Sequence, residues 1–447
     1  TFNGAYQFSG TIDGGAGNNT VVGPDVINAW AITGDDASTL TPTGATGASS
    51  FTNIGNLTGG SAADTFTFNG AFQLSGVTGI DGGAGANTII GPDLTTAWAI
   101  TGDEIGTINP TGASGATSFV NIGALTGGSA ADTFTFNGAY QFSGTIDGGA
   151  GNNTVVGPDV INVWEITADN ASTLTPTGAV GASSFTNIGN LTGGTGADTF
   201  ILSDNVGVSG IINGTSASGN ILDYSAYTAT AVTVDLDAGT ATKITGGIGN
   251  IQKLIAGQAA NTFSASTTVD NIFEFQANPT VASTVTGDAT MEDTIIRTEG
   301  TNTWNITGND DGYVGNITFT DMKNLTGGSG DDSFIFGAAW QISGTTGIDG
   351  GGGDNALTGP DAVTNEWIVS VDAGTLTPGG AGATLFTNIG SLVGGSGADN
   401  FTLSGASSLS GTTGIDGAGG TNSITGPNVN TDWQITGAIT GTVTPDG

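Results

Sequence analysis

The feature that most constrains the fold of this chain is a ten-residue marker that recurs along its length. The marker combines a leucine, a glycine-rich turn and an acid, as in LTGGSAADTF from Leu57 and again from Leu125. Further copies are LTGGTGADTF from Leu191, LIAGQAANTF from Leu254, LTGGSGDDSF from Leu325 and LVGGSGADNF from Leu392. The spacings between copies are 68, 66, 63, 71 and 67 residues. A period of this size indicates a repeat array and not a set of independent globular domains.

The marker divides the sequence into one continuous array. The predicted repeats are 1–56 (partial), 57–124, 125–190, 191–253 and 254–324 (both degenerate), 325–391, and 392–447 (partial). The opening residues TFNGAYQFSG match residues 135–144, and the closing TVTPDG matches STLTPTG of an earlier repeat. We therefore expect both ends of the sequence to be cuts in a longer array.

Each repeat divides again into similar segments. In the 125–190 repeat, the marker aligns with IDGGAGNNTV from Ile146 and, more weakly, with ITADNASTL from Ile166. Short runs such as DTFTF, NTVVG and VWEIT, bounded by Gly, Asn, Asp and Pro, predict strands, and no segment has a helical period. The sequence therefore predicts an all-β chain, a right-handed parallel β-solenoid (β-helix) with about three coils per repeat and about 20 coils in all.

The charge balance limits the partners that such a solenoid could bind. The chain has 39 acidic and 4 basic residues, no His and no Cys, and a formal net charge of −35. Nucleic acid and anionic membrane surfaces need a cationic face, so neither is expected as a partner. No apolar run is long enough to insert into a membrane. The four basic residues all lie in one region, at Lys243, Lys253, Arg297 and Lys323.

The glycine-rich turns are the candidate metal sites. Full GGxGxD turns end at Asp198, Asp332 and Asp399, and near matches end at Asp64 and Asp132; the second segment of each repeat ends its turn in Asn instead, at Asn19, Asn87, Asn153, Asn355 and Asn422. Gly supplies positive φ for a tight turn, and a terminal Asp or Asn can cap the turn backbone. Oxygen ligands alone would suit Ca²⁺. Both interpretations, structural cap and Ca²⁺ site, are open at this point.

These turns resemble the GGxGxDxUx nonapeptide of hemolysin-type (RTX) calcium-binding proteins, with GGTGADTFI and GGSGDDSFI as the nearest copies. The resemblance implies Ca²⁺ held between successive turns by backbone carbonyls and by the carboxylates of Asp64, Asp132, Asp198, Asp332 and Asp399. Here the turns recur about 21 residues apart, and two of three have lost the acid.

A broader resemblance covers most of the chain. The stretch from Leu222 to Gly257, and the run W-x-I-T…F-x-N-I-G-x-L-x-G-G from Trp164 to Gly194, are similar to repeats in very large bacterial surface and secreted proteins. Those exoproteins and adhesins are acidic, poor in Cys and often calcium-dependent. The resemblance implies an extracellular or cell-surface location and no catalytic residues.

A column of tryptophans is the strongest aromatic pattern. It comprises Trp30, Trp98, Trp164, Trp304, Trp367 and Trp433, each in the pattern W-x-(I/V). An outward column could bind sugars, but residues two apart share a strand face, and the second is apolar, so we predict that the column lies in the core. A second slot holds Tyr6, Phe72, Tyr140 and Trp340, then Ser408. Thr-x-Thr pairs, at Thr65/Thr67, Thr133/Thr135 and Thr173/Thr175, could order ice, although outward Thr is common on any sheet.

Catalysis is not predicted. Without Cys or His there is no thiol or imidazole nucleophile–base pair. A polysaccharide lyase would need Ca²⁺-binding acids and a basic residue, and Arg297 lies near Glu292, Asp293 and Glu299, where an ion pair is the simpler interpretation.

The predicted function is that of a non-enzymatic extracellular structural protein. In this role the solenoid forms the shaft of a fibre, filament or matrix and associates with itself; the alternative is an adhesin that binds glycans or a host surface. The irregular 204–324 region is either a diverged pair of repeats or a contact with a neighbouring acidic rod.

Overall fold

The computed structural model describes residues 1–436 and 440–445, and every helix or strand found in that part of the chain is a β-strand. Asp446 and Gly447, the end of the TVTPDG segment, lie outside the described residues. The strands form stacked sheets with mainly parallel pairing, which confirms the predicted β-solenoid class. The chain makes two compact units, Thr1–Leu222 with Lys243–Ile251, and Asp223–Thr242 with Gln252–Gly447.

The 125–190 repeat shows the basic design, with seven strands. They are β13 (Ala124–Thr126), β14 (Thr133–Phe136), β15 (Thr145–Asp147), β16 (Thr154–Val156), β17 (Asn162–Ala168), β18 (Ala171–Pro176) and β19 (Ser183–Thr186). Side chains alternate between the two faces of a strand. In β14 the two Phe residues are therefore buried, whereas the two Thr residues are partly exposed on the outer face.

Successive strands of the repeat alternate between two sheets. Strand β13 pairs in parallel with β15, and β15 pairs with β19, whereas β14 pairs with β16 in the other sheet. The fifth to seventh strands, β17–β18–β19, stay in one sheet as an antiparallel meander. The chain thus changes sheet an odd number of times per repeat, so β20 (Asn190–Thr192), which opens the next repeat, pairs with β16 in the second sheet. Equivalent residues of consecutive repeats in the first unit therefore lie at opposite edges of the solenoid, whereas β27 and β35, which open the 254–324 and 325–391 repeats, lie in the same sheet.

The meander refines the expectation of three similar coils. The segment ITADNASTL, predicted to open the third coil, is the hairpin between β17 and β18. Asn170 at this hairpin has φ of 56°, a left-handed conformation that Asn tolerates better than most residues. The third coil therefore carries three strands in one sheet, and β18 runs against the direction of its neighbours.

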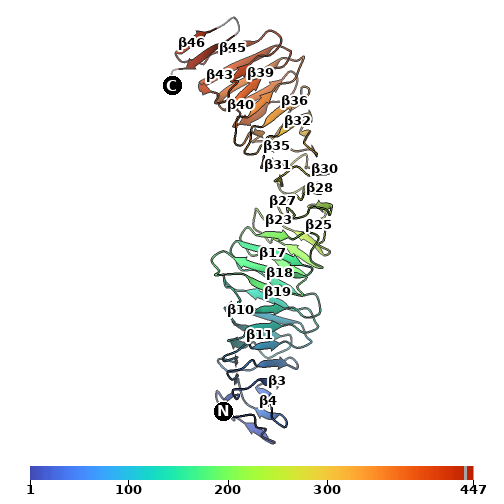
Figure 1. The fold of residues 1–447 in the computed structure, drawn as a ribbon, viewed down its shortest axis with the longest axis vertical. Coiled ribbons are helices and arrows are strands. Elements are labelled where there is room, and N and C mark those ends of the chain that lie inside the picture. Colours follow the sequence, from blue (N-terminus) through green and yellow to red (C-terminus); the bar gives the residue numbers. More distant parts are fainter. Residues whose placement is uncertain (437–439, 446–447) are drawn as a thin grey trace. The chain divides into compact units, whose positions relative to one another are not determined.

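The remaining strands of the first unit repeat this plan (Figure 1). One sheet has the order β2-β6-β8-β12-β11-β10-β14-β16-β20-β22-β26. The strands before β13 are β1 (Thr11–Asp13), β2 (Thr20–Val22), β3 (Asn28–Gly34), β4 (Ala37–Pro42), β5 (Ser49–Thr52), β6 (Asn56–Thr58), β7 (Thr65–Phe68), β8 (Ile80–Asp81), β9 (Thr88–Ile90), β10 (Thr96–Gly102), β11 (Ile105–Pro110) and β12 (Thr117–Val120).

The degenerate 191–253 repeat departs from the plan at its meander. Its strands are β20, β21 (Thr199–Leu202), β22 (Ile211–Asn213), β23 (Ile221–Asp223), β24 (Val232–Asp235), β25 (Thr240–Ala241) and β26 (Gly247–Gly249). Strand β26 pairs with β22 in the first unit, whereas β24 and β25 pair with each other in the second. The segment that corresponds to the meander is thus divided between the two units.

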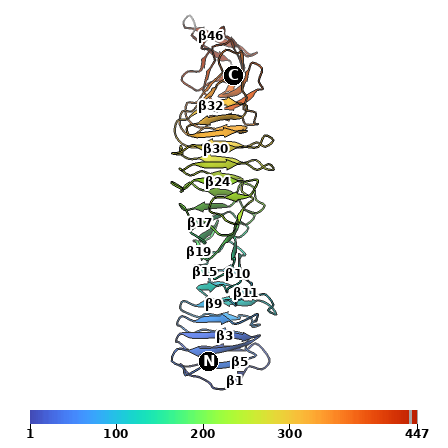
Figure 2. The same ribbon diagram turned by 90° about the vertical axis from the view of Figure 1, so that its right-hand side faces the viewer.

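The second unit stacks strands in the same way (Figure 2). Its degenerate repeat has β27 (Lys253–Ile255), β28 (Asn261–Ser264), β29 (Ile272–Phe275), β30 (Ser283–Thr286), β31 (Thr294–Arg297), β32 (Thr303–Gly308), β33 (Asp311–Val314) and β34 (Ile317–Thr320). The regular strands that follow are β35 (Asn324–Thr326), β36 (Ser333–Phe336), β37 (Ile348–Asp349), β38 (Ala356–Thr358), β39 (Asn365–Val371), β40 (Ala373–Pro378), β41 (Thr384–Thr387), β42 (Ser391–Val393), β43 (Asp399–Ser408), β44 (Ile415–Asp416), β45 (Ser423–Thr425), β46 (Thr431–Ile435) and β47 (Gly441–Pro445).

The core is a set of continuous apolar ladders between the sheets. In one sheet Leu125 pairs with Ile146, and Ile146 with Phe185. In the other, Trp98 pairs with Phe134, and their rings stack with centroids 5.4 Å apart. All five side chains are at most 2% exposed. Since burial of one such side chain contributes about 1.5–3 kcal/mol, the ladders are the main stabilising feature of each repeat.

Candidate functional site

The five predicted aspartates cap turns at the edges of the solenoid, and each is buried. Oδ1 of Asp64 accepts the backbone N–H and the side-chain Nδ2–H of Asn28, at 2.7 and 2.8 Å. Its Oδ2 accepts the N–H of Gly60 at 2.7 Å, which closes the glycine turn. The N–H of Asp64 itself donates to Oδ1 of Asn87 at 2.9 Å. Each aspartate thus joins three successive coils in a corner triad (Asn28–Asp64–Asn87 in this copy).

The same triad recurs at the other four positions. The sets are Thr96–Asp132–Asn153, Asn162–Asp198–Asn220, Asn302–Asp332–Asn355 and Asn365–Asp399–Asn422. The sequence predicted each Asp and, at four of the five positions, the following Asn, which ends a similar turn one coil further on; Asn220 was not predicted. It missed the preceding member, although an Asn or Thr stands two residues before each buried Trp and was a usable signal.

Burial and hydrogen bonding oppose each other at these carboxylates. Desolvation raises the pKa of Asp132 to about 6, and the N–H groups of Gly128 and Thr96 partly counteract it. Burial also raises the pKa of Asp64, Asp198, Asp332 and Asp399. A buried carboxylate is tolerated here because the turn backbone provides its hydrogen bonds.

The alternation of sheets separates the acidic turns from one another. Consecutive aspartates of the first unit lie at opposite edges, and the neighbours of each along its own edge are the Asn or Thr members of its triad. Among the described residues, no group of three or more His, Cys, Asp or Glu could hold a metal ion. Calcium at Asp64, Asp132, Asp198, Asp332 and Asp399 stays a prediction of the resemblance, and the oxygens of these carboxylates face N–H donors of the turns.

The tryptophan column lies in the core, as predicted, at five of its six positions. Trp30, Trp98, Trp164, Trp304 and Trp367 are at most 1% exposed, whereas Trp433 is 47% exposed. A ring that is at most 1% exposed cannot present a face to a sugar. The second aromatic slot differs, because Tyr6, before β1, and Tyr140, in the loop after β14, are exposed.

Three of the four basic residues interact with groups of the chain itself. Lys253 forms an ion pair with Glu274 at 2.5 Å. Hydrogen bonds from Thr345 and, more weakly, the charge of Lys323 lower the pKa of Glu292. Arg297 is buried and donates to Oδ1 of Asn302 at 3.2 Å and to the carbonyl of Phe275 at 3.4 Å. Because these basic side chains are engaged within the chain, the 204–324 region fits a diverged pair of repeats better than a contact with a neighbouring acidic rod.

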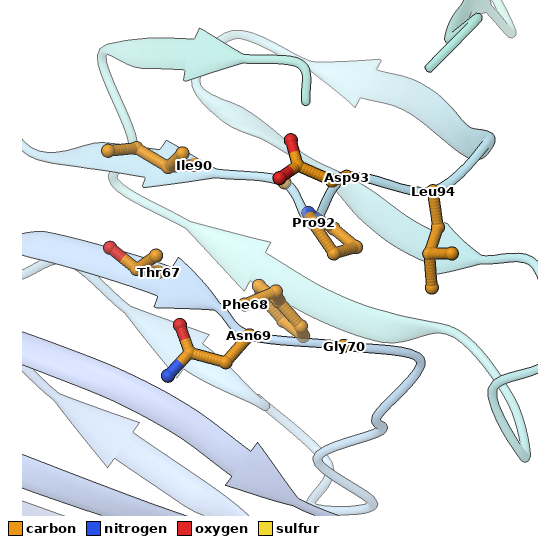
Figure 3. A pocket seen from close by; sticks show the side chains of 9 residues that line it. Thr67, Phe68, Asn69, Gly70, Ile90, Pro92, Asp93 and Leu94 are labelled. Carbon is orange, nitrogen blue, oxygen red and sulfur yellow. The ribbon is translucent and has the colours of Figure 1, made fainter. Parts of the chain in front are cut away.

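A hollow of about 580 Å³ lies in the first unit between residues 67–70 and 90–94. We call it the Gly91 hollow. Its labelled side chains come from the ends of β7 and β9 and from the turn that leads to β10, with Asp93 at the rim and Phe68 pointing inward (Figure 3). Both Asn69 and Asp93 are exposed, so the hollow is open to solvent.

No protein-family model and no curated protein matches this chain. Within the described residues, no helix is long and apolar enough to cross a membrane.

Proposed function

We propose that this chain is a non-enzymatic, extracellular structural protein of bacterial type, an acidic β-solenoid that forms the shaft of a surface fibre, filament or matrix. The observation that carries the proposal is the recurrence of the corner triad at five positions, four times with Asn and once with Thr as the first member. An active site is built once, whereas these buried acids occur at equivalent positions and each is engaged in capping a turn.

The distribution of charge supports self-association along the sheet faces. Between residues 1 and 222 the acids lie in turns or at strand ends, with Glu165 in β17 as the exception. The outer faces are built mainly from Thr, Ser and Ala, and edge carboxylates repel each other only weakly beyond the Debye length of about 8 Å at physiological salt. Flat faces with little charge would allow shafts to pack side by side despite the net charge of −35.

Electron microscopy of the purified chain over a concentration series tests this proposal. We expect fibres or lateral bundles that become more frequent with concentration and with salt. Isolated particles at every concentration would contradict self-association. Turnover of any polysaccharide by the chain would contradict the non-enzymatic assignment.

An adhesin is the second candidate, and the exposed aromatic slot is the observation in its favour. Tyr6 is 71% and Tyr140 is 41% exposed. A glycan array probed with the chain and with a Tyr6→Ala/Tyr140→Ala variant separates the two proposals. Glycan binding that the variant loses would support the adhesin. Absence of glycan binding by the unmodified chain would contradict the adhesin and favour the shaft.

A further inference from the structure

Four Asn-Gly pairs occur in the chain, and three of them share one position in the repeat. Asn3, Asn69 and Asn137 each lie in the sequence FNGA, directly before an aromatic residue of the second slot. The fourth pair, Asn213 with Gly214, stands at the end of β22. The same dipeptide is thus present in two different settings of one fold.

An Asn-Gly pair can modify itself without an enzyme or a cofactor. The backbone nitrogen of the glycine attacks Cγ of the Asn side chain, and the new C–N bond closes a succinimide ring. The bond from Cγ to Nδ2 breaks, and the proton of the attacking nitrogen leaves with the ammonia that is released. Water then opens the ring at either of its carbonyls, which gives aspartate or isoaspartate. Glycine permits the approach because it has no Cβ.

At Asn69 both reacting groups are free of hydrogen bonds. The N–H of Asn69 donates to the carbonyl of Ile32 at 3.0 Å, whereas the N–H of Gly70 and the Asn69 side-chain amide have no hydrogen bond among the described residues. Asn69 is exposed and lies where β7 ends and the chain continues through Gly70 (Figure 3). Asn137 and Gly138 repeat this arrangement. Both pairs are therefore open to ring closure and to water.

The turn that follows these pairs does not itself require Asn-Gly. The N–H of Phe72 donates to the carbonyl of Gly70 at 2.9 Å. In the second unit the N–H of Trp340 donates to the carbonyl of Ala338 at 2.7 Å, and Gly337 stands where the first unit has Asn. The same turn is thus formed by Gly-Ala in one unit and by Asn-Gly in the other.

The pair at the end of β22 is held by hydrogen bonds. The N–H of Gly214 donates to the carbonyl of Gly249 at 3.0 Å. Oδ1 of Asn213 accepts from the N–H of Thr215 at 2.9 Å and from Nδ2–H of Asn250 at 2.8 Å. These bonds must break before the glycine nitrogen can attack the side chain, so the fold protects this pair.

We propose that Asn69 and Asn137 are sites of spontaneous deamidation in the folded chain and that Asn213 is protected. Asn3, which has the same free groups, belongs with the first two. Each event replaces a neutral amide by a carboxylate beside the second aromatic slot, and the isoaspartate form also adds one methylene to the backbone. At Asn69 the new charge lies at the Gly91 hollow, which Asp93 also lines. This modification does not depend on the shaft proposal.

Incubation of the full chain in ¹⁸O-labelled water at neutral pH tests the proposal. Peptide mass spectrometry after digestion at low pH locates each conversion, the label dates it to the incubation, and electron-transfer fragmentation separates isoaspartate from aspartate. We expect first-order conversion at Asn69 and Asn137 that is independent of protein concentration and faster at higher pH, because the attacking nitrogen must lose its proton. Conversion at Asn213 should be at least about tenfold slower, since hydrogen bonds to both reacting groups must break first.

The same incubation in denaturant separates the effect of the fold from that of the dipeptide. In the unfolded chain Asn69, Asn137 and Asn213 should react at similar rates, because each is then an Asn-Gly pair in a flexible chain. Unfolding should therefore accelerate the reaction at Asn213 far more than at Asn69. Equal rates at these two residues in the folded chain, or equal acceleration on unfolding, would overturn the proposal.

The variants Gly70→Ala and Gly138→Ala are a reciprocal pair, in which each chain keeps the other site as its internal control. A Cβ at residue 70 would lie 2.8 Å from the ring of Phe72, which is partly exposed and has room to move. Gly70→Ala should slow conversion at Asn69 and leave Asn137 unchanged, and Gly138→Ala should do the reverse. Unchanged conversion at Asn69 in Gly70→Ala would show that the glycine nitrogen is not the attacking group and would overturn the mechanism. None of these results bears on fibre formation.

Discussion

The regular 125–190 repeat and the degenerate 254–324 repeat differ in how the Asn before the Trp strand is hydrogen-bonded. In each, the Asn before the Trp strand donates its backbone N–H to a buried aspartate of the following repeat, at 2.8 Å from Asn162 to Asp198 and at 2.6 Å from Asn302 to Asp332. Oδ1 of Asn162 is buried without a hydrogen-bond partner, whereas Oδ1 of Asn302 accepts from Arg297. The corner triad is thus common to both places, whereas the buried Arg297 beside it is a local addition.

Removing the tryptophan should have the largest effect in both repeats. We expect Trp164→Ala and Trp304→Ala each to lower the free energy of unfolding by about 3–5 kcal/mol, because each leaves a large cavity against a stacked Phe. Denaturant unfolding monitored by circular dichroism measures this. Trp340→Ala, at a partly exposed position, should cost less than about 1 kcal/mol. A small cost at Trp304 alone would show that the degenerate repeat packs its core differently.

The second largest effect should come from the triad. Asp198→Ala and Asp332→Ala each leave several buried N–H groups without acceptors, so we expect a loss of about 2–4 kcal/mol. Asp198→Asn keeps one acceptor oxygen and should cost less than Asp198→Ala. If Asp198→Asn and Asp198→Ala lower the melting temperature equally, the hydrogen bonds of the capping carboxylate do not stabilise the corner.

Much of this corner could be predicted from the sequence, because its residues recur. The period located Asp198 and the Trp column, and the spacing of two between Trp164 and Ile166 placed both on the inward face. The alternation of sheets could not be predicted in this way, since it depends on whether the number of crossings per repeat is odd. That number changes when the third coil folds back as a meander, and only the pairing of β17 with β18 reveals it.

Replacing Arg297 should distinguish the two repeats more sharply than replacing a capping aspartate. Arg297→Met leaves Oδ1 of Asn302 unsatisfied and Asp332 without a nearby positive charge, and we expect a loss of about 1–3 kcal/mol. The double variant Arg297→Met/Asp332→Asn should lose less than the sum of the single variants, by about 0.5 kcal/mol or more. Strict additivity would mean that Arg297 stabilises the repeat by packing alone.

The buried acids should make stability depend on pH in an unusual direction. Burial raises the pKa of Asp132 from 3.8 to about 6, so between these values the folded chain binds more protons than the unfolded chain. Stability should therefore fall as the pH rises through this window and stay level above it, by up to about 1–2 kcal/mol for this group. Urea unfolding at pH 4.5 and pH 7 measures the difference. Asp132→Asn should flatten the profile more than Asp103→Asn does; equal profiles would assign the effect to the net charge.

Removal of Ca²⁺ by a chelator should have the smallest effect on stability, and this test applies to both repeats. At all five aspartate turns, N–H donors occupy the carboxylate, as from Gly194 to Asp198 and from Gly328 to Asp332. A Ca²⁺ ion would have to displace these donors, and the buried oxygens of one isolated Asp are fewer than the six to eight ligands that Ca²⁺ takes. We expect excess chelator to move the melting temperature by less than about 1 °C, and less than about 0.5 kcal/mol of stability to be lost. A fall of several degrees, restored by Ca²⁺ and absent in Asp198→Asn, would instead place calcium at these turns, as the hemolysin-type resemblance implies.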